Sequence, residues 1–81
     1  MVRLKNIRKN ENDNIIECDI IPEDSTESGW VKVDLKSYEI IDYKLPKGYE
    51  YCRNHVAHAR KRLKELSKLD NLPEKDLVMW Y

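Results

Sequence analysis

Residues Gly48–Asn71, GYEYCRNHVAHARKRLKELSKLDN, form the stretch that decides the fold, because apolar residues recur in it at helical spacing. A narrow apolar stripe follows one side of this predicted helix, at intervals of four, three, four and three residues: Cys52, Val56, Ala59, Leu63 and Leu66. A helix with so narrow a stripe is stabilised mainly by packing, so the rest of the chain must supply a surface that covers it.

The residues at both ends of this segment suit a helix. Glu50 fits the positive N-terminal end of a helix dipole, and Lys68 fits the negative C-terminal end. Asn71 can adopt a left-handed cap conformation, and Pro73 cannot continue a helix. The helix is therefore predicted to stop near Asp70.

The first two strands are predicted from alternating apolar residues. Residues 2–9 alternate and then lose phase, which predicts a bulge near Asn6. Turn-forming residues at 11–14 lead to a second extended run over 15–21, which ends because Pro22 has no N–H to donate. The residues of this run that share one face are Ile16, Cys18 and Ile20. The two runs predict a hairpin.

Two further strands are predicted before the helix. Trp30–Leu35 alternates strictly, and the residues expected to face the core are Val31, Val33 and Leu35. Lys36–Ser37 makes the turn to Tyr38–Leu45, whose inward parity is ambiguous because two isoleucines are adjacent. We favour Ile41 and Tyr43 as the inward residues, which requires a three-residue hairpin loop.

A fifth strand is predicted at the C-terminal end, where DLVMWY (76–81) is apolar and rich in residues that favour strands. The sequence thus predicts an α+β fold in a single domain over residues 1–81. We expect an antiparallel β-meander of four strands, one long helix packed on one face, and a C-terminal fifth strand.

The charge of the chain is balanced overall but segregated along it. Fifteen basic and fifteen acidic residues cancel in 81 residues, so the whole chain is not drawn to polyanions. Residues 1–10 are basic, residues 11–29 are acidic, and residues 23–29 predict a mobile polar loop. No apolar run approaches the ~20 residues of a membrane span or resembles a secretory signal, so we expect a cytoplasmic protein.

The segment GYEYCRNHVAHAR (Gly48–Arg60), IIPEDS (Ile20–Ser25) and the terminal MWY are together similar to the layout of short bacterial proteins of unknown function. The resemblance spans nearly the whole chain. Because those proteins have no established activity, it carries over no catalytic residue and no cofactor. It implies a stand-alone, intracellular bacterial protein.

The sequence offers weak candidates for a metal site and for catalysis. Cys52, His55 and His58 form a Cys-x2-His-x2-His sequence, but successive members rotate around the helix, so the three ligands do not converge well on one metal ion. The alternative, which we favour, places Cys52 in the core as a reduced thiol beside ordinary histidines. No nucleophile motif or phosphate-binding loop is present, so we expect no enzyme activity, no cofactor and no metal.

The helix carries a basic stripe that makes nucleic acid a candidate partner. Its members fall on one arc of the helix without an acidic side chain: Arg53, Arg60, Lys61, Lys64 and Lys68. An ordinary solvated face explains the same pattern, and the acidic residues 11–29 could occupy the stripe within the chain. We keep binding of nucleic acid as the alternative function.

Aromatic residues provide the function that we favour. Trp30 has the parity opposite to the inward valines, so an open sheet face would expose it, as in a protein-binding surface. The residues predicted to bind protein are Trp30, Tyr38, Tyr43 and Trp80. The acidic loop or the C-terminal aromatics could instead cover this face. We expect a protein partner or a homodimer that uses the open face or an edge strand.

Overall fold

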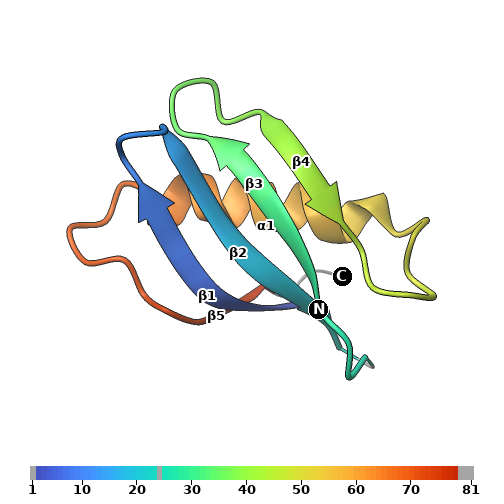
Figure 1. Cartoon of the computed structure of the whole chain (residues 1–81). Helices are drawn as coiled ribbons and strands as arrows, with labels where there is room; N and C mark the ends of the chain where they lie inside the picture. The colour runs from blue at the N-terminus through green and yellow to red at the C-terminus, as the bar shows by residue number, and fades with distance from the viewer. Residues whose placement is uncertain (1, 24, 79–81) are drawn as a thin grey trace.

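Alternating apolar residues build a sheet from the first half of the chain, and the amphipathic segment builds a helix beside it (Figure 1). The computed structural model describes residues 2–23 and 25–78. The elements are β1 (Val2–Asn10), β2 (Ile15–Pro22), β3 (Gly29–Asp34), β4 (Ile40–Lys44), α1 (Arg53–Leu66) and β5 (Asp76–Val78). The sheet order is β4-β3-β2-β1-β5. The α+β class and the four-stranded antiparallel meander with one helix against it are confirmed.

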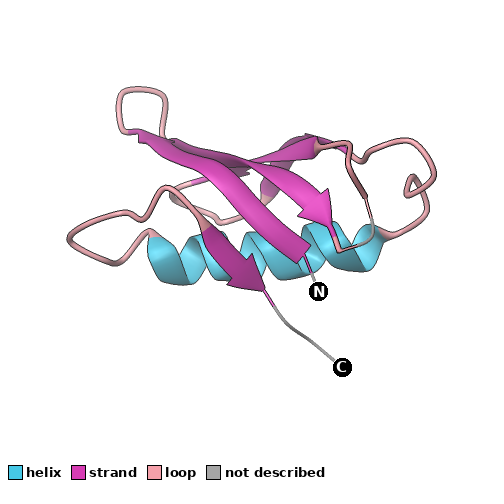
Figure 2. Cartoon of the chain, turned by 90° about the horizontal axis from the view of Figure 1, so that it is seen from below, coloured by secondary structure: helices cyan, strands magenta, loops and turns pink. Residues whose placement is uncertain are grey.

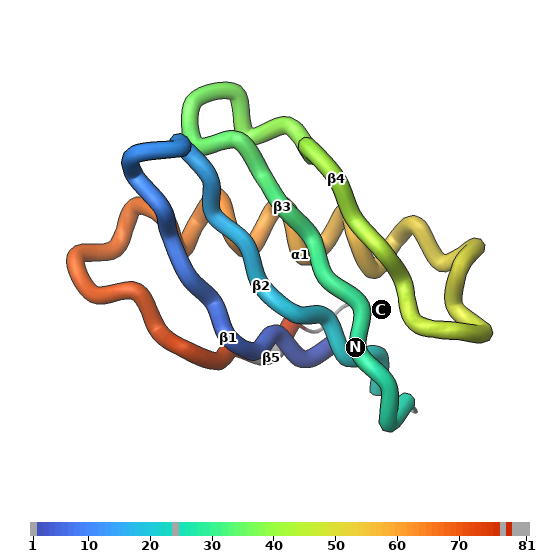
Figure 3. The backbone as a smooth tube through the Cα atoms, in the orientation of Figure 1, coloured from blue at the N-terminus to red at the C-terminus, as the bar shows by residue number. Residues whose placement is uncertain are grey.

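β5 is a short strand that pairs antiparallel with β1, with Val78 opposite Val2. It is reached by a segment that leads from the end of α1 back to the border of the sheet (Figure 3). Arg62 of α1 makes an ion pair with Asp76, which ties the start of β5 to the helix. The rest of the predicted fifth strand, residues 79–81, lies outside the described residues.

The core lies between α1 and one face of the sheet (Figure 2). α1 packs chiefly against β2 and β3. The buried apolar residues are Val2, Leu4, Ile7, Ile16, Cys18, Ile20, Val31, Val33, Leu45, Val56, Ala59, Leu63 and Leu66. Four of the five predicted stripe residues are among them, and each buried leucine contributes about 1.5–3 kcal/mol to the burial free energy. The fifth, Cys52, is half-buried because it precedes the first helical turn.

The helix is shorter than predicted at both ends. Before it, the backbone N–H groups of Tyr49 and Cys52 donate to carbonyl oxygens three residues back, and Gly48 has φ of 90°, so residues 46–52 form separate turns. Glu50 accepts a hydrogen bond from the Gly48 N–H rather than standing in the first helical turn. At the other end, Lys68 donates to a carbonyl three residues back, so this segment tightens and leaves the helix.

The hairpin of β1 and β2 confirms the prediction from the turn formers at 11–14. The register between the strands shifts between Lys5 and Arg8, which confirms the bulge near Asn6. Asn6 has φ of 52°, a left-handed conformation that asparagine adopts more readily than most residues.

The predicted inward parity of the fourth strand is wrong at Ile41, which is 51% exposed. A bulge in β4 places one extra residue between the pair Val33–Ile40 and the pair Lys32–Asp42. Ile40 therefore packs against the core instead. Tyr43 is opposite the buried Val31 and so lies on the side that was predicted.

Tyr38 belongs to the turn before β4 and not to the strand. It has φ of 59°, which is uncommon for a bulky side chain. Arg60 of α1 donates a hydrogen bond to its carbonyl oxygen at 3.0 Å, and its ring lies 5.3 Å from the Lys64 ammonium. Its hydroxyl is 3.3 Å from that of Ser67. Tyr38 thus fastens this turn to the second half of the helix.

Gly29, the first residue of β3, is required by the close approach of the chain after β4. A Cβ atom built at Gly29 would overlap the carbonyl oxygen of Lys44 and would touch the Cα of Leu45. Because both obstacles are backbone atoms, relief requires the strand ends to move apart.

We expect Gly29→Ala to lower the free energy of unfolding by about 1–3 kcal/mol, since overpacking against backbone forces the strands to shift. The exposed neighbour Ser28 provides the control, and Ser28→Ala should change stability by less than about 0.5 kcal/mol. Urea unfolding of both variants measures the difference. Equal midpoints for the two would show that β3 and the end of β4 are not in close contact.

Asp34 organises the turn between β3 and β4 with its carboxylate. Its Oδ1 accepts hydrogen bonds from the backbone N–H groups of Lys36, at 2.7 Å, and Ser37, at 3.0 Å. The N–H of Ser37 and then that of Lys36 hold the pKa of Asp34 below its ordinary value of 3.8. A lowered pKa means that the charged carboxylate stabilises the folded state above the ordinary value, and that this contribution is lost as the pH falls through the folded-state pKa.

Asp34→Asn keeps an acceptor oxygen but removes the charge, so we expect it to be less stable than the wild type at pH 6. The difference should shrink as the pH falls below 3.8, because the wild-type carboxylate then becomes protonated too. Urea unfolding at a series of pH values measures it. A difference that stays constant down to pH 2 would contradict the role of the charge in this turn.

Candidate protein-binding surface

The sheet face opposite α1 is charged, and where neighbouring strands both carry a charge in one of its two rows, the two charges are opposite in sign. Antiparallel register places cross-strand partners on the same face. One row across the sheet is Lys5, Asp19, Trp30 and Lys44, and the next row is Arg8, Glu17, Lys32 and Asp42. The acidic residues of β2 therefore lie beside basic residues of β1 and beside Lys32 of β3, so the opposite charges that are segregated along the chain meet on this face.

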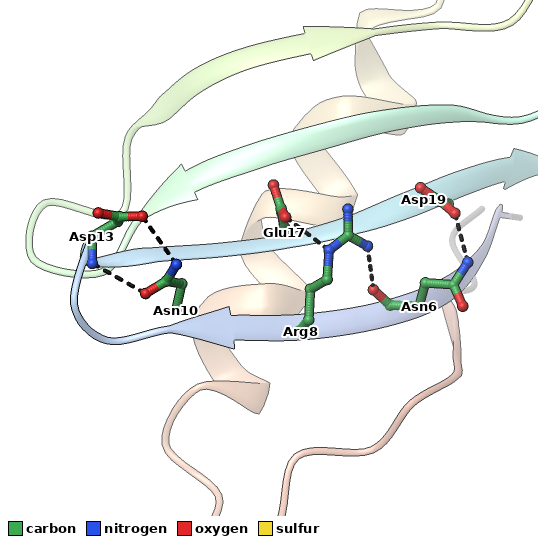
Figure 4. A network of polar contacts seen from close by, with 6 residues as sticks. All are labelled: Asn6, Arg8, Asn10, Asp13, Glu17 and Asp19. Carbon is green, nitrogen blue, oxygen red and sulfur yellow. Dashed lines mark hydrogen bonds and ion pairs between the residues drawn. The ribbon is translucent and has the colours of Figure 1, made fainter.

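Hydrogen bonds hold part of this face in place (Figure 4). The Arg8 Nε donates to Glu17 Oε1 at 2.7 Å, and another Arg8 nitrogen donates to the carbonyl oxygen of Asn6 at 2.8 Å. The Asn6 side chain donates to Asp19 at 2.7 Å. Asn6, the bulge residue, thus links the two rows through Asp19 and Arg8. The acidic side chains of β2 bind to β1 rather than to the basic helix.

Trp30 lies on this open face, as predicted, but it is only partly exposed. The Lys32 ammonium is 5.5 Å from the centroid of its ring, within the range of a cation–π contact. Its neighbours in the row are charged. The open face therefore lacks the continuous apolar area that marks protein-binding surfaces.

A more apolar surface lies at the border of the sheet, between β4 and the first half of α1. This β4–α1 groove is lined by Ile40, Tyr43, Arg53, Val56 and Ala57. It exists because α1 is centred over β2 and β3 and leaves the border strand partly uncovered. Tyr43 is 37% exposed in the groove, and Ile41 is 51% exposed on the same strand.

The structure separates the three aromatic residues predicted to bind protein that it describes. Tyr43 lines the groove, Trp30 lies on the opposite face, and Tyr38 is half-buried against α1. Trp80 lies outside the described residues. Tyr51, which was not predicted, is 97% exposed in the turn before α1.

The predicted basic stripe is divided between two roles. Arg60 and Lys64 contact Tyr38 and so help to hold the turn before β4. The other members are exposed: Arg53, Lys61 and Lys68. Arg62, which was outside the predicted stripe, makes ion pairs with Glu65 and Asp76, and its hydrogen bond to Asp76 raises its pKa.

The cysteines and histidines do not form a metal site in the part of the chain that the structure describes. The Nδ1 atom of His55 lies 3.3 Å from the Cys52 carbonyl oxygen, and its ring contacts Tyr49 edge-on. Cys18 is fully buried, and burial, with a smaller effect from Asp19, raises its pKa from 9.0 to about 12. A thiol held neutral in this way is a poor nucleophile and a poor metal ligand.

The groove was only partly visible in the sequence. Tyr43 was predicted to bind protein, and Arg53 was predicted to bind nucleic acid. The apolar lining residues Ile40, Val56 and Ala57 were not predicted as binding residues. Isoleucine and valine at those positions look like core residues, and a border strand is identified only by the order of strands in the sheet. In the sequence, the adjacent isoleucines at 40 and 41 indicate that one of the two apolar side chains lies outside the core.

Within residues 2–23 and 25–78, no helix has the length and apolarity needed to cross a membrane. The resemblance to short bacterial proteins of unknown function stays a prediction. Comparison of the chain with protein-family models, with curated proteins and with solved structures finds no match.

Proposed function

We propose that this chain is a non-enzymatic protein-interaction module that binds an extended polypeptide segment along β4. The observation that carries the proposal is the coincidence, on one strand, of outward-facing backbone groups and an apolar groove. An added strand would bond to the backbone and place its side chains in the β4–α1 groove.

The direction of the backbone groups follows from the turn that precedes β4. The N–H of Asp34 donates to Glu39, its carbonyl oxygen accepts from Tyr38, and the N–H of Leu35 donates to Asn14. Even-numbered residues of β3 therefore bond toward β4, and odd-numbered ones bond toward β2. Because Tyr43 is opposite the odd-numbered Val31, its N–H and C=O groups point away from β3.

The outward N–H of Tyr43 donates a local hydrogen bond to the Oδ1 atom of Asp42 at 2.8 Å. A carboxylate of the preceding residue is an acceptor that an incoming carbonyl oxygen can replace. The groove beside it offers apolar contact for one or two side chains, and exposed Arg53 offers a positive charge to an acidic residue of the segment.

A photoreactive amino acid in place of Ile41 tests this proposal in the native cells. We expect crosslinks to polypeptide from position 41 and none from a control at exposed Asn12, in the β1–β2 turn. Tyr43→Pro removes both the ring and the outward N–H, whereas Tyr43→Ala removes the ring alone. Crosslinking should be abolished by Tyr43→Pro and reduced about tenfold or less by Tyr43→Ala.

Thermal melts of both variants establish that they fold. Folded Tyr43→Pro protein that crosslinks as well as the Tyr43→Ala protein would overturn strand addition at β4. Crosslinks of equal strength from positions 41 and 12 would show that the bound segment does not lie specifically along β4.

Binding of nucleic acid remains the alternative, and the exposure of Arg53, Lys61, Lys64 and Lys68 supports it. We expect this function to require the exposed residues Lys61 and Lys68, since Lys64 also contacts the Tyr38 ring. The double substitution Lys61→Glu and Lys68→Glu should therefore abolish oligonucleotide binding at low salt. Fluorescence anisotropy with labelled single- and double-stranded oligonucleotides measures it. No binding by the wild-type protein at micromolar concentration would exclude this alternative.

A further inference from the structure

We infer that the segment received by β4 is β4 of a second copy of the same chain, paired antiparallel about Tyr43. This inference rests on the proposed function, because it names the partner of the same strand. The sheets of the two copies would then be continuous across the β4–β4 contact. β4 is available for it, since it forms a border of the sheet with β3 as its neighbour (Figure 1).

Charge selects one register for this pairing. Opposite residues of antiparallel strands share a face, and Asp42 and Lys44 lie on the open face while Tyr43 lies on the helix side. A symmetric contact centred on Asp42 would place two aspartates together, and one centred on Lys44 would place two lysines together. A contact centred on Tyr43 places Asp42 of each copy opposite Lys44 of the other, which gives two pairs of opposite charge.

The same register continues the alternation of charge across the open face. In the row that ends with Lys32 and Asp42, the next residue would be Lys44 of the second copy. In the row that ends with Trp30 and Lys44, the next residue would be Asp42 of the second copy. β4 therefore carries both charges that extend the two rows, the negative charge of Asp42 and the positive charge of Lys44.

The backbone of Tyr43 is suited to be the centre of the contact. Its N–H and C=O groups face away from β3, so two copies can exchange a pair of hydrogen bonds there. The carbonyl oxygen of the second copy would replace Asp42 Oδ1 as the acceptor, and the Asp42 carboxylate would turn to Lys44 of that copy. The two Tyr43 rings would meet on the helix side as a cross-strand aromatic pair.

The contact is short, because the bulge at Ile41 interrupts the regular edge of β4. We therefore expect a weak, reversible dimer whose contact is smaller than the ~1,200 Å² of stable complexes. Its formation should be visible by sedimentation equilibrium at protein concentrations up to about 1 mM.

Charge exchange between the two positions tests the register. The D42K chain has lysine at both positions and the K44D chain has aspartate at both, so each variant alone would bring like charges together. We expect each to dimerise about tenfold more weakly than the wild type. An equimolar mixture of the two should associate as tightly as the wild type, because opposite charges then meet at both pairs.

The mixture is its own control, since each chain carries the same internal change alone and in the mixture, and thermal melts establish that both are folded. A wild-type protein that stays monomeric at 1 mM would overturn the self-pairing. So would single variants that dimerise like the wild type, or a mixture that associates no better than its components. A monomeric wild type that still crosslinks to another polypeptide from position 41 would leave the proposed function intact and reject only the second copy as partner.

Discussion

The structure depends on the burial of one narrow helical stripe against the centre of a sheet. Ala59 and Leu63 are fully buried in α1, and they pack in the same core as Cys18 of β2 and Val31 of β3. A helix of fourteen residues is only marginally stable on its own. This contact therefore stabilises both α1 and the sheet. The position of the stripe over β2 and β3 also determines which strand remains partly uncovered.

That position explains why the two faces and the border of the sheet differ in character. The face without a helix is stabilised by opposite charges on neighbouring strands, and such exposed pairs contribute little free energy each. Their main effect is on specificity, because a shift in register would bring like charges together. The border strand β4 is covered less by the helix and less by charge pairs than the other strands. Its apolar side chains and outward backbone groups are therefore exposed to solvent.

Local sequence patterns were sufficient to predict the fold class, the meander, the hairpin bulge and the residues of α1 that are buried. They could not predict where the helix begins, because the hydrogen bonds of the turns at 46–52 compete with helical ones at similar local cost. They also failed at Ile41, since a bulge changes which of two apolar neighbours faces the core. The charged rows could not be predicted from local patterns, because they depend on the register between residues far apart in sequence. For the same reason, the sequence supplied Tyr43 as a candidate but not the groove around it.

The attachment of Tyr38 to α1 has a thermodynamic consequence for any ligand of the groove. The turn before β4 is held to the helix by Arg60, Lys64 and Ser67, and the turns after β4 lead directly into the start of the helix. The two walls of the β4–α1 groove, the strand and the helix, are thus joined by side-chain contacts near one end and covalently near the other. Their separation is therefore set before a ligand binds. Such preorganisation means that association costs little conformational entropy in this chain, so that the ordering cost is small for a second copy and larger for a flexible segment.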